Sequence, residues 1–368
     1  MSSPLARRGA VIAGIAVLLV IPYYVEAFWL QAGLFCMAAA IAAIGLTLLV
    51  GVTGQLSLAH VFFVAIGAYG YCYLAGEEAP AGLADAPSGL GLPPWVALIG
   101  AVALAGLAGA LFSPIAGRLR GIYLGLASVG LIFIGQHILF NATGVTGGFN
   151  GRDAVPFSLF GFSFSDTQPD NFSVLGVPYG TLERLWYLGL ALLALSWWYA
   201  RNLVRSRPGR AMQQVRDSEV AAAVMGVNVP AYKAAAFTVS SMYAGLGGVF
   251  LAVVFGRIVP ESFGFLVSIE FLVMIVIGGL GSIGGAIAGA ALVTALPQIF
   301  TKYSDSLPLV AEAGGSGLQA SHASRFLYAA AVIAVLIYAP HGLAGLARRF
   351  AKRRPNSPPT VQTEESTT

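Results

Sequence analysis

The stretch GLTLLVGVTGQLSLAHVFFVAIGAYGYCYLA, residues 45–75, contains two apolar runs separated by a short segment of glycines and polar side chains. The second run is long enough for a helix that crosses roughly 30 Å of hydrocarbon. The first run is also long enough when the apolar residues before Gly45 are included. Gln55, Ser57 and His60 lie at the start of the second run. The pattern predicts a turn between two membrane helices, followed by a broken-helix element. His60 either lines a gate there or binds a backbone carbonyl of a neighbouring helix.

The whole chain has the composition of an integral membrane protein. Of its 368 residues, 57% are hydrophobic and only 10% are charged, against roughly 25% charged residues in a soluble domain. A soluble protein needs polar side chains to cover its surface, so this composition excludes that class. The net charge of +4 does not indicate a nucleic-acid-binding protein. We interpret residues 1–24 as the start of a first membrane helix rather than a cleaved signal peptide, because further spans follow at once.

The hydropathy pattern predicts an all-α fold, a polytopic transmembrane bundle of about ten helices. Small residues recur three or four positions apart, as in AGLAGA and YAGLGG, and allow helix backbones to approach closely. The bundle is therefore expected to be compact. The predicted spans are 9–29, 32–50, 58–75, 95–116, 121–140, 184–200, 232–256, 263–280, 283–300 and 325–341.

The distribution of positive charge predicts that both termini lie in the cytoplasm, because cytoplasmic loops carry an excess of lysine and arginine. With that orientation most of the 20 basic residues fall inside: Arg7, Arg8, Arg118, Arg120, Arg201, Arg205, Arg207, Arg210, Arg216, Lys233, Arg348, Arg349, Lys352, Arg353 and Arg354. A shift by one helix would destroy this segregation. The turn at residues 51–57 then lies on the cytoplasmic side.

The domain organisation follows from these spans. We expect one transmembrane domain, residues 1–350, and a cytoplasmic tail, residues 351–368, that is basic and then disordered. Residues 141–183 form a long external loop, and residues 201–231 form the largest cytoplasmic segment. Loops of this length often carry function.

The cytoplasmic segment contains a predicted short helix. Asp217 or Ser218 is its N-cap, and Glu219 lies in the first turn, where the helix dipole favours an anion. Gly226 ends it, followed by Asn228 as a stop signal. Its apolar face consists of Val220, Ala223 and Val224. This face predicts a partner protein docking from the cytoplasm, with burial in the lipid headgroup layer as the alternative.

Glu270 is the one acidic residue about two turns into a predicted span. A carboxylate at that depth is costly, so it either faces the bundle interior on a permeation path or forms a structural hydrogen bond. The chain has no G-x-x-x-x-G-K-[S/T] phosphate loop, no His/Cys/Glu cluster with metal-ligand spacing and no nucleophile elbow. We therefore expect a transport subunit that binds no cofactor of its own, and not an enzyme.

Four separated segments resemble the branched-chain amino acid permeases of bacterial ABC importers, of the LivM type. They are residues 45–75, LRGIYLGLASVGLIFI with TGVTGGFNG, the run RSRPGRAMQQVRDSEVAAAVMGVNVPAYK, and ESFGFLVSIEFLVMIVIGGLGSIGGAIAGAALVTALPQ. The resemblance covers roughly residues 40–350. It implies a type II importer-like permease in the bacterial cytoplasmic membrane, surrounded by lipid. Implied partners are a homologous permease subunit, two cytoplasmic ATPases that bind ATP and Mg, an external solute-binding protein and a small-molecule substrate.

The resemblance also assigns roles to residues. The polar residues at membrane depth, Gln55, Ser57, His60 and Glu270, are the predicted translocation pathway or gate. An external gate or binding-protein contact is expected at Gly147, Gly148 and Asn150. ATPase coupling is implied for Asp217, Glu219, Ala222, Gly226 and Asn228. The coupling segment departs from the EAA loop of other importers, because one additional residue separates Glu219 from Gly226. Relatives carry urea, amides and aromatic or steroid-like carboxylates as well as branched-chain amino acids.

Two alternatives from other classes remain open on the sequence. A proton-coupled secondary carrier would use Glu270 as its titrating group. A passive channel would conduct a small solute such as urea or an amide without ATP.

Overall fold

The computed structural model describes residues 17–78, 87–119, 121–165 and 180–303, together with Gly14, two short strands within 173–178 and scattered positions between 326 and 345. The predicted first span is described from residue 17 onward, whereas most of the predicted last span and the tail 351–368 lie outside the described residues. Every predicted span between 32 and 300 coincides with a helix. Five of these helices are long and apolar enough to cross a membrane, and two more are shorter apolar helices. The helical class is thus confirmed, while the total number of spans stays a prediction.

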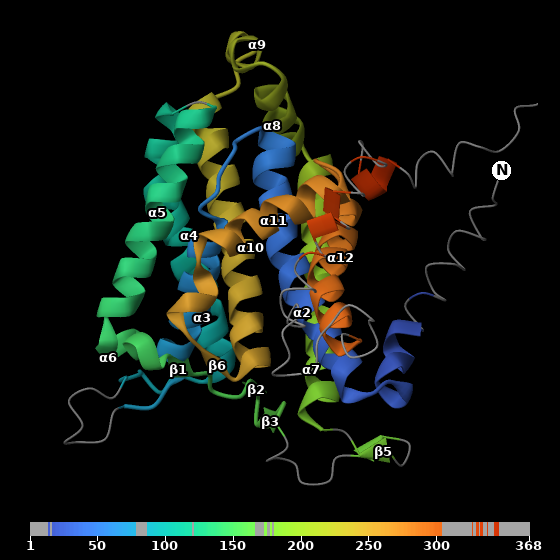
Figure 1. The fold of residues 1–368 in the computed structure, drawn as a ribbon. Coiled ribbons are helices and arrows are strands. Elements are labelled where there is room, and N and C mark those ends of the chain that lie inside the picture. Colours follow the sequence, from blue (N-terminus) through green and yellow to red (C-terminus); the bar gives the residue numbers. More distant parts are fainter. Residues whose placement is uncertain are drawn as a thin grey trace, which may run out of the picture.

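The helices follow one another in the order of the predicted spans (Figure 1). They are α2 (Ala27–Leu46) with the π-helical turn η1 (Thr47–Val52), α3 (His60–Ala75), α4 (Pro94–Arg118), α5 (Ile122–Asn141), α6 (Thr143–Thr146), α7 (Thr181–Arg205), α8 (Arg207–Asp217), α9 (Glu219–Val224), α10 (Val229–Phe255), α11 (Phe265–Gly278) and α12 (Ile283–Lys302). Two 3₁₀ turns, η2 (Gly148–Asn150) and η3 (Pro260–Phe263), lie in the connections.

The expectation of an all-α fold needs a small correction at one end of the bundle. Three ladders of two-residue strands lie there (Figure 1). They pair β1 (Arg152–Asp153) with β6 (Arg257–Ile258), β2 (Ser158–Leu159) with β3 (Phe162–Ser163), and β4 (Ser173–Val174) with β5 (Val177–Pro178). The strands are too short to show the alternating hydrophobic pattern from which sheets are predicted. We call this the ladder end, and it is the predicted external side.

The core is built around α2 and α10. α2 is buried along most of its length, and α10 packs against α2, α3 and α4. A Cβ on Gly67 of α3 would collide with the backbone carbonyl of Gly245 in α10. A Cβ on Gly245 would in turn lie 2.5 Å from the Ala105 Cβ of α4. Glycine is therefore required where these helix backbones meet, as the small-residue pattern predicted.

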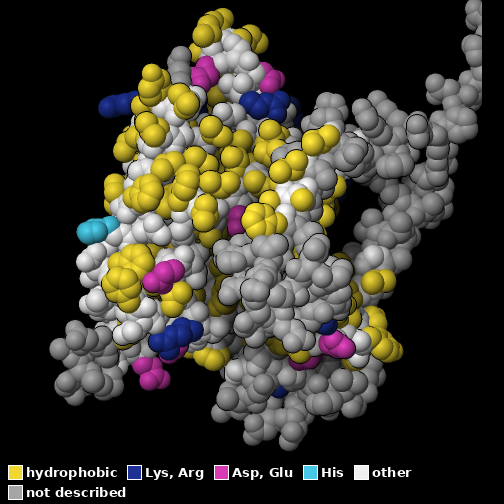
Figure 2. Space-filling model, viewed as in Figure 1, with side chains coloured by type: hydrophobic (Ala, Val, Ile, Leu, Met, Phe, Trp, Pro, Cys, Tyr) yellow, Lys and Arg dark blue, Asp and Glu magenta, His cyan; other side chains and the backbone are white. Residues whose placement is uncertain are grey.

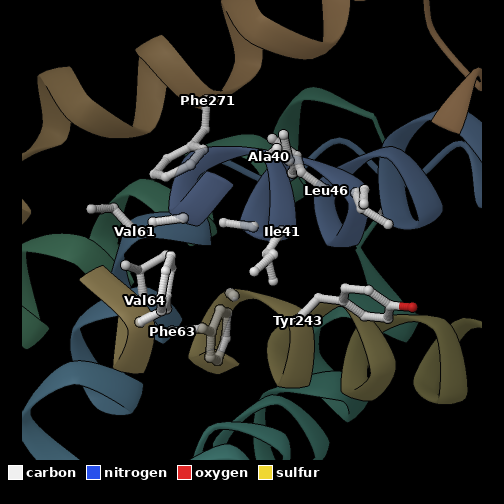
Figure 3. Packing of buried hydrophobic residues seen from close by; sticks show 14 of the residues in the cluster. Ala40, Ile41, Leu46, Val61, Phe63, Val64, Tyr243 and Phe271 are labelled. Carbon is white, nitrogen blue, oxygen red and sulfur yellow. The ribbon is translucent and has the colours of Figure 1, made fainter. Parts of the chain in front are cut away.

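Large side chains fill the space between these contacts. Figure 3 shows Phe63 of α3 reaching the α10 backbone, and Phe271 of α11 lying over α2 and α3. The Phe63 ring meets the Phe237 ring edge to face at 5.7 Å, an arrangement that adds to the burial energy. A broad hydrophobic band crosses the middle of the molecule, and charged side chains gather at its two ends (Figure 2). This distribution is typical of a protein surrounded by lipid.

Candidate functional site

The predicted short helix after residue 217 is present as α9, at the tip of the bundle opposite the ladder end (Figure 1). Ser218 caps it, because the Ser218 hydroxyl accepts a hydrogen bond of 3.2 Å from the Ala221 amide. Of the two caps that the sequence left open, Ser218 is thus the one used. Asp217 instead ends α8 and forms an ion pair of 3.0 Å with Arg216.

The end of α9 also follows the prediction. Gly226 has a φ of +82°, a backbone conformation that glycine adopts without strain. Asn228 begins the next helix, since its side-chain oxygen accepts a hydrogen bond of 3.2 Å from the Ala231 amide. Two punctuating residues therefore fix the turn between α9 and α10.

The surface of α9 is apolar and exposed. Val220, Val224 and Met225 are 73%, 82% and 77% exposed, respectively. Ala222, which the resemblance placed among the coupling residues, is buried and faces the rest of the chain. The exposed apolar residues of α9 and its C-cap are thus Val220, Ala221, Ala223, Val224 and Met225, whereas Ala222 is buried.

The broken-helix element lies between η1 and α3. Residues 54–57 form no helix, so their backbone polar groups need other partners. Non-helical backbone at membrane depth is tolerated where neighbouring side chains satisfy it. At Leu58 this is done by two serines, since the Ser128 hydroxyl of α5 accepts from the Leu58 amide at 2.8 Å and the Ser268 hydroxyl of α11 donates to the Leu58 carbonyl. The break is therefore held by two other helices.

The three predicted polar residues of this element are all buried. The Ser57 hydroxyl accepts a hydrogen bond of 3.3 Å from the Ala59 amide. His60 Nε2 lies 2.8 Å from the carbonyl oxygen of Ala42 in α2, and its ring contacts Phe271 edge to face. His60 thus makes the bond to a neighbouring backbone carbonyl that the sequence offered as one of two readings.

A second glycine-rich turn meets the first. Gly51 in η1 lies against the turn between α11 and α12, where a Cβ on Gly51 would collide with the backbone nitrogen of Gly281. Gly281 has a φ of +80°. The two helix interruptions that the sequence showed separately are thus in direct contact.

Arg216, near the end of α8, lies at this junction. Its Nη1 donates a hydrogen bond of 2.8 Å to the Gly51 carbonyl oxygen. A Cβ on Gly54 would lie 2.9 Å from the Arg216 Cγ, so the side chain also runs along the start of the break. The sequence predicts for Arg216 no role beyond that of a cytoplasmic charge.

Lys233, in the first turns of α10, makes a second link. Its ammonium forms an ion pair of 2.5 Å with Glu219 of α9. The Lys233 carbonyl oxygen accepts a hydrogen bond of 3.2 Å from Gln55 Nε2. The Lys233 side chain is almost fully buried, whereas that of Glu219 is about one third exposed. Lys233 therefore joins α9 to the broken-helix element. The sequence shows only that a lysine lies at the start of a helix, which does not predict this role.

Helix α8 was not predicted either, although its start carries a readable signal. Ser206 caps it by accepting from the Gly209 amide, and Pro208 occupies the first turn. Ser followed by Pro is a common helix start. Met212 and Val215 are its buried side chains and hold α8 against the bundle, which positions Arg216.

The predicted external residues lie at the ladder end. Gly147 ends α6 with a φ of +73°, and Gly148 is buried. The Asn150 carbonyl oxygen accepts hydrogen bonds of 3.2 and 2.8 Å from Arg257 Nε and Nη2. These bonds and the β1–β6 ladder hold the loop after α5 against the end of α10.

Arg152 fixes the same loop from inside. Its Nη1 donates hydrogen bonds of 2.8 and 2.7 Å to the carbonyls of Ser88 and Val145. Burial lowers the pKa of the Arg152 guanidinium from its usual value, partly offset by the fields of Cys72 and Tyr73. The predicted external site is therefore a hydrogen-bonded turn.

Glu270 lines a separate cavity of about 490 Å³. Helices α2, α3, α10, α11 and α12 form its walls. Gln31, Thr294 and Gln298 add the other polar side chains, and the remaining lining is apolar. Glu270 is exposed at the surface of the isolated chain, so it sits where the cavity opens. The other predicted pathway residues, Gln55, Ser57 and His60, do not line the cavity. His60 nevertheless contacts two lining residues, through its bond to the Ala42 carbonyl and its ring contact with Phe271.

Comparison with known proteins identifies the family. The profile described as "Branched-chain amino acid transport system / permease component" matches residues 30–336. The chain belongs to this permease family. It is 33% identical to "High-affinity branched-chain amino acid transport system permease protein LivM" of Escherichia coli (strain K12), over 77% of this chain and 66% of that protein. The LivM protein of Salmonella typhimurium is 34% identical, over 72% of this chain and 62% of that protein.

A more distant relative differs in type. The LivH permease protein of Salmonella typhimurium is 27% identical, over 72% of this chain and 84% of that protein. The permease is therefore of the LivM type, although it spans slightly less than two thirds of the length of the LivM relatives it matches. No solved structure matches the chain. The family match and the apolar helices together indicate that the chain is a multi-pass membrane protein.

Proposed function

We propose that the permease is a membrane subunit of a binding-protein-dependent ABC importer in the cytoplasmic membrane of a bacterium. It carries a branched-chain amino acid or a related small amphipathic solute into the cell. Its partners are a homologous permease subunit, two cytoplasmic ATPases that bind ATP and Mg, and an external solute-binding protein. The permease chain itself binds no cofactor. The relatives whose names state branched-chain amino acid transport support this proposal.

The observation that carries the proposal is the pair of links from the α8–α9 hairpin to the broken-helix element. Exposed apolar side chains on α9 offer a docking surface, and exposed apolar patches rimmed by polar residues are typical of protein contacts. Behind that surface, Arg216 reaches Gly51 and Lys233 reaches Gln55 through its carbonyl. A force applied to α9 by a partner is therefore transmitted to the interruption in the membrane helices.

The mechanism follows from these contacts. Closure of the ATPases on ATP moves α9 and α8 together, because Ser218 joins them directly. Arg216 and Lys233 then shift the Gly51–Gln55 segment, and Gly51 passes the movement to Gly281 between α11 and α12. Small shifts of this kind are amplified when packed elements switch between two arrangements. The solute enters from the ladder end, between the permease and its partner permease.

The test is uptake by the reconstituted complex. The permease, the ATPases encoded beside it and the cognate binding protein are placed in proteoliposomes with radiolabelled leucine outside. We expect concentrative uptake that requires internal ATP and persists when a protonophore collapses the proton gradient. Uptake driven by a proton gradient without ATPases would identify a secondary carrier, and ATP-independent equilibration would identify a channel. Either result overturns the proposal.

A further inference from the structure

The Glu270 carboxylate has no hydrogen-bond or ion-pair partner among the residues that the structure describes. It nevertheless lies on α11, an apolar helix, about one and a half turns from the helix start. An unpaired carboxylate in a membrane helix is costly unless it faces water or a group of opposite charge. Glu270 lies at the opening of the 490 Å³ cavity, so a molecule that occupies the cavity can place a group of opposite charge against its carboxylate.

The cavity has the properties of a small-molecule site. Its volume falls within the roughly 300–1,000 Å³ range of ligand pockets, and its lining is mainly apolar with a few polar groups. Leu251, Phe271 and Met274 are among the walls that suit an aliphatic chain. The Thr294 hydroxyl is buried without a hydrogen-bond partner in the described part of the chain, and it lines the same cavity. Two unsatisfied polar groups therefore border one apolar space.

The charge of the lining selects the ligand. Glu270 is the only charged residue among the lining residues. A carboxylate-only or phosphate ligand would be repelled by Glu270 with no cation to offset it. A primary ammonium would form a charge-assisted hydrogen bond to Glu270, stronger than a bond between neutral groups. Thr294, Gln31 and Gln298 offer donors for a second polar group of the same molecule.

We propose that this cavity, the Glu270 cavity, is a binding site for an aliphatic molecule that carries a primary ammonium group. Glu270 holds the ammonium, and the apolar wall holds the hydrocarbon. The same chemistry is present in a free branched-chain amino acid and in the ethanolamine headgroup of a phospholipid. The assignment of a transported solute to the site rests on the proposed function, but the site itself is tested by binding alone.

The experiment measures binding to the full-length permease, without ATPases or binding protein, in nanodiscs of phosphatidylglycerol only. The probes are 3-methylbutylamine, which has the ammonium and the aliphatic chain, and 4-methylpentanoate, which has the chain and a carboxylate. Isothermal titration should give saturable binding of the amine and none of the carboxylate. Glu270→Gln should weaken amine binding about tenfold to a hundredfold, as expected for the loss of a hydrogen bond to a charged group.

Two further variants keep the test decisive. Glu261→Gln removes an exposed carboxylate outside the cavity and should leave amine binding unchanged. Ala39→Phe fills the cavity while leaving Glu270 in place, and should abolish binding even if Glu270→Gln folds poorly. Equal amine affinity in the wild type and both cavity variants, or equal affinity for the amine and the carboxylate, would overturn the site.

Two measurements distinguish the two sources of the ammonium group. One changes the lipid composition of the nanodiscs, and the other adds leucine as a competitor of the amine. If nanodiscs with phosphatidylethanolamine weaken amine binding, the headgroup occupies the site; if leucine competes and the lipid does not, the occupant is the free amino acid. Both results support an ammonium site. Because this experiment measures no transport, its result does not depend on the proposed function. The binding site can exist even if the reconstituted complex shows no ATP-driven uptake, and the complex can be an importer even if no amine binds.

Discussion

Arg216 Nη1 lies 2.8 Å from the Gly51 carbonyl oxygen, across 165 positions of the sequence. The bond joins the helix before α9 to the π-helical turn at the end of α2. The carbonyls at the end of a helix have no partner within it, and here an arginine outside the helix supplies one. The bond thus links α8 directly to the membrane helices.

Arg216→Met is expected to uncouple ATP hydrolysis from uptake. The half-exposed bond contributes about 1 kcal/mol, enough to change a two-state equilibrium about fivefold. The measurement is leucine taken up per ATP hydrolysed in proteoliposomes. Arg210→Met is the matched control, because Arg210 is exposed on the same helix and its side chain donates to the Arg205 carbonyl at the end of α7. If both variants give the wild-type ratio, Arg216 transmits nothing.

Glu219→Gln is expected to destabilise the permease more than Lys233→Met. The Lys233 ammonium is buried, so loss of Glu219 leaves it without its ion-pair partner in an apolar environment, whereas Glu219 remains accessible to water after loss of Lys233. A double-mutant cycle on the free energy of unfolding should give a coupling energy of about 1–3 kcal/mol. A coupling energy near zero would contradict a working link between α9 and α10.

His60→Ala is expected to reduce stability rather than to block transport. The variant removes the bond to the Ala42 carbonyl and leaves a space beside Phe271, at a cost of about 2–4 kcal/mol. Thermal unfolding in detergent measures the loss, and uptake should scale with the folded fraction. Normal stability combined with lost uptake would instead make His60 a gate residue.

Gly226→Leu is expected to reduce coupled uptake, while Gly226→Asn retains more of it. No atom lies within 4 Å of a Cβ at this position, so the effect comes from the backbone alone. Leucine at a φ of +82° costs about 1–2 kcal/mol, and asparagine tolerates this conformation better. Uptake per ATP again supplies the readout. If leucine and asparagine behave alike, the conformation of this turn does not matter for coupling.

The helices could be predicted because apolar runs of membrane length leave few alternatives. The roles of Ser218, Gly226 and Asn228 at helix ends could also be predicted, because helix caps and positive-φ turns depend on neighbouring residues in the sequence. The links of Arg216 and Lys233 could not be predicted, because they join residues far apart in the sequence and depend on how α8 and α10 pack. The apolar face inferred for α9, Val220, Ala223 and Val224, is exposed as predicted, whereas the burial of Ala222 depends on packing.

The Glu270 cavity illustrates the same limit. The sequence showed that Glu270 is costly at its depth, but five separate helices form the walls around it. Gln55, Ser57 and His60 do not line this cavity, but His60 contacts two residues that do, Ala42 and Phe271.

The close approach of α3, α4 and α10 has a consequence for how the protein is made. Gly245 of α10 lies between Gly67 of α3 and Ala105 of α4, with no room for a side chain. Ribosomes synthesise α3 and α4 long before α10. These two helices therefore enter the bilayer before α10, the helix that later packs between Gly67 and Ala105. Until α10 is inserted, the place that Gly245 will occupy must be filled by lipid or shielded by the insertion machinery.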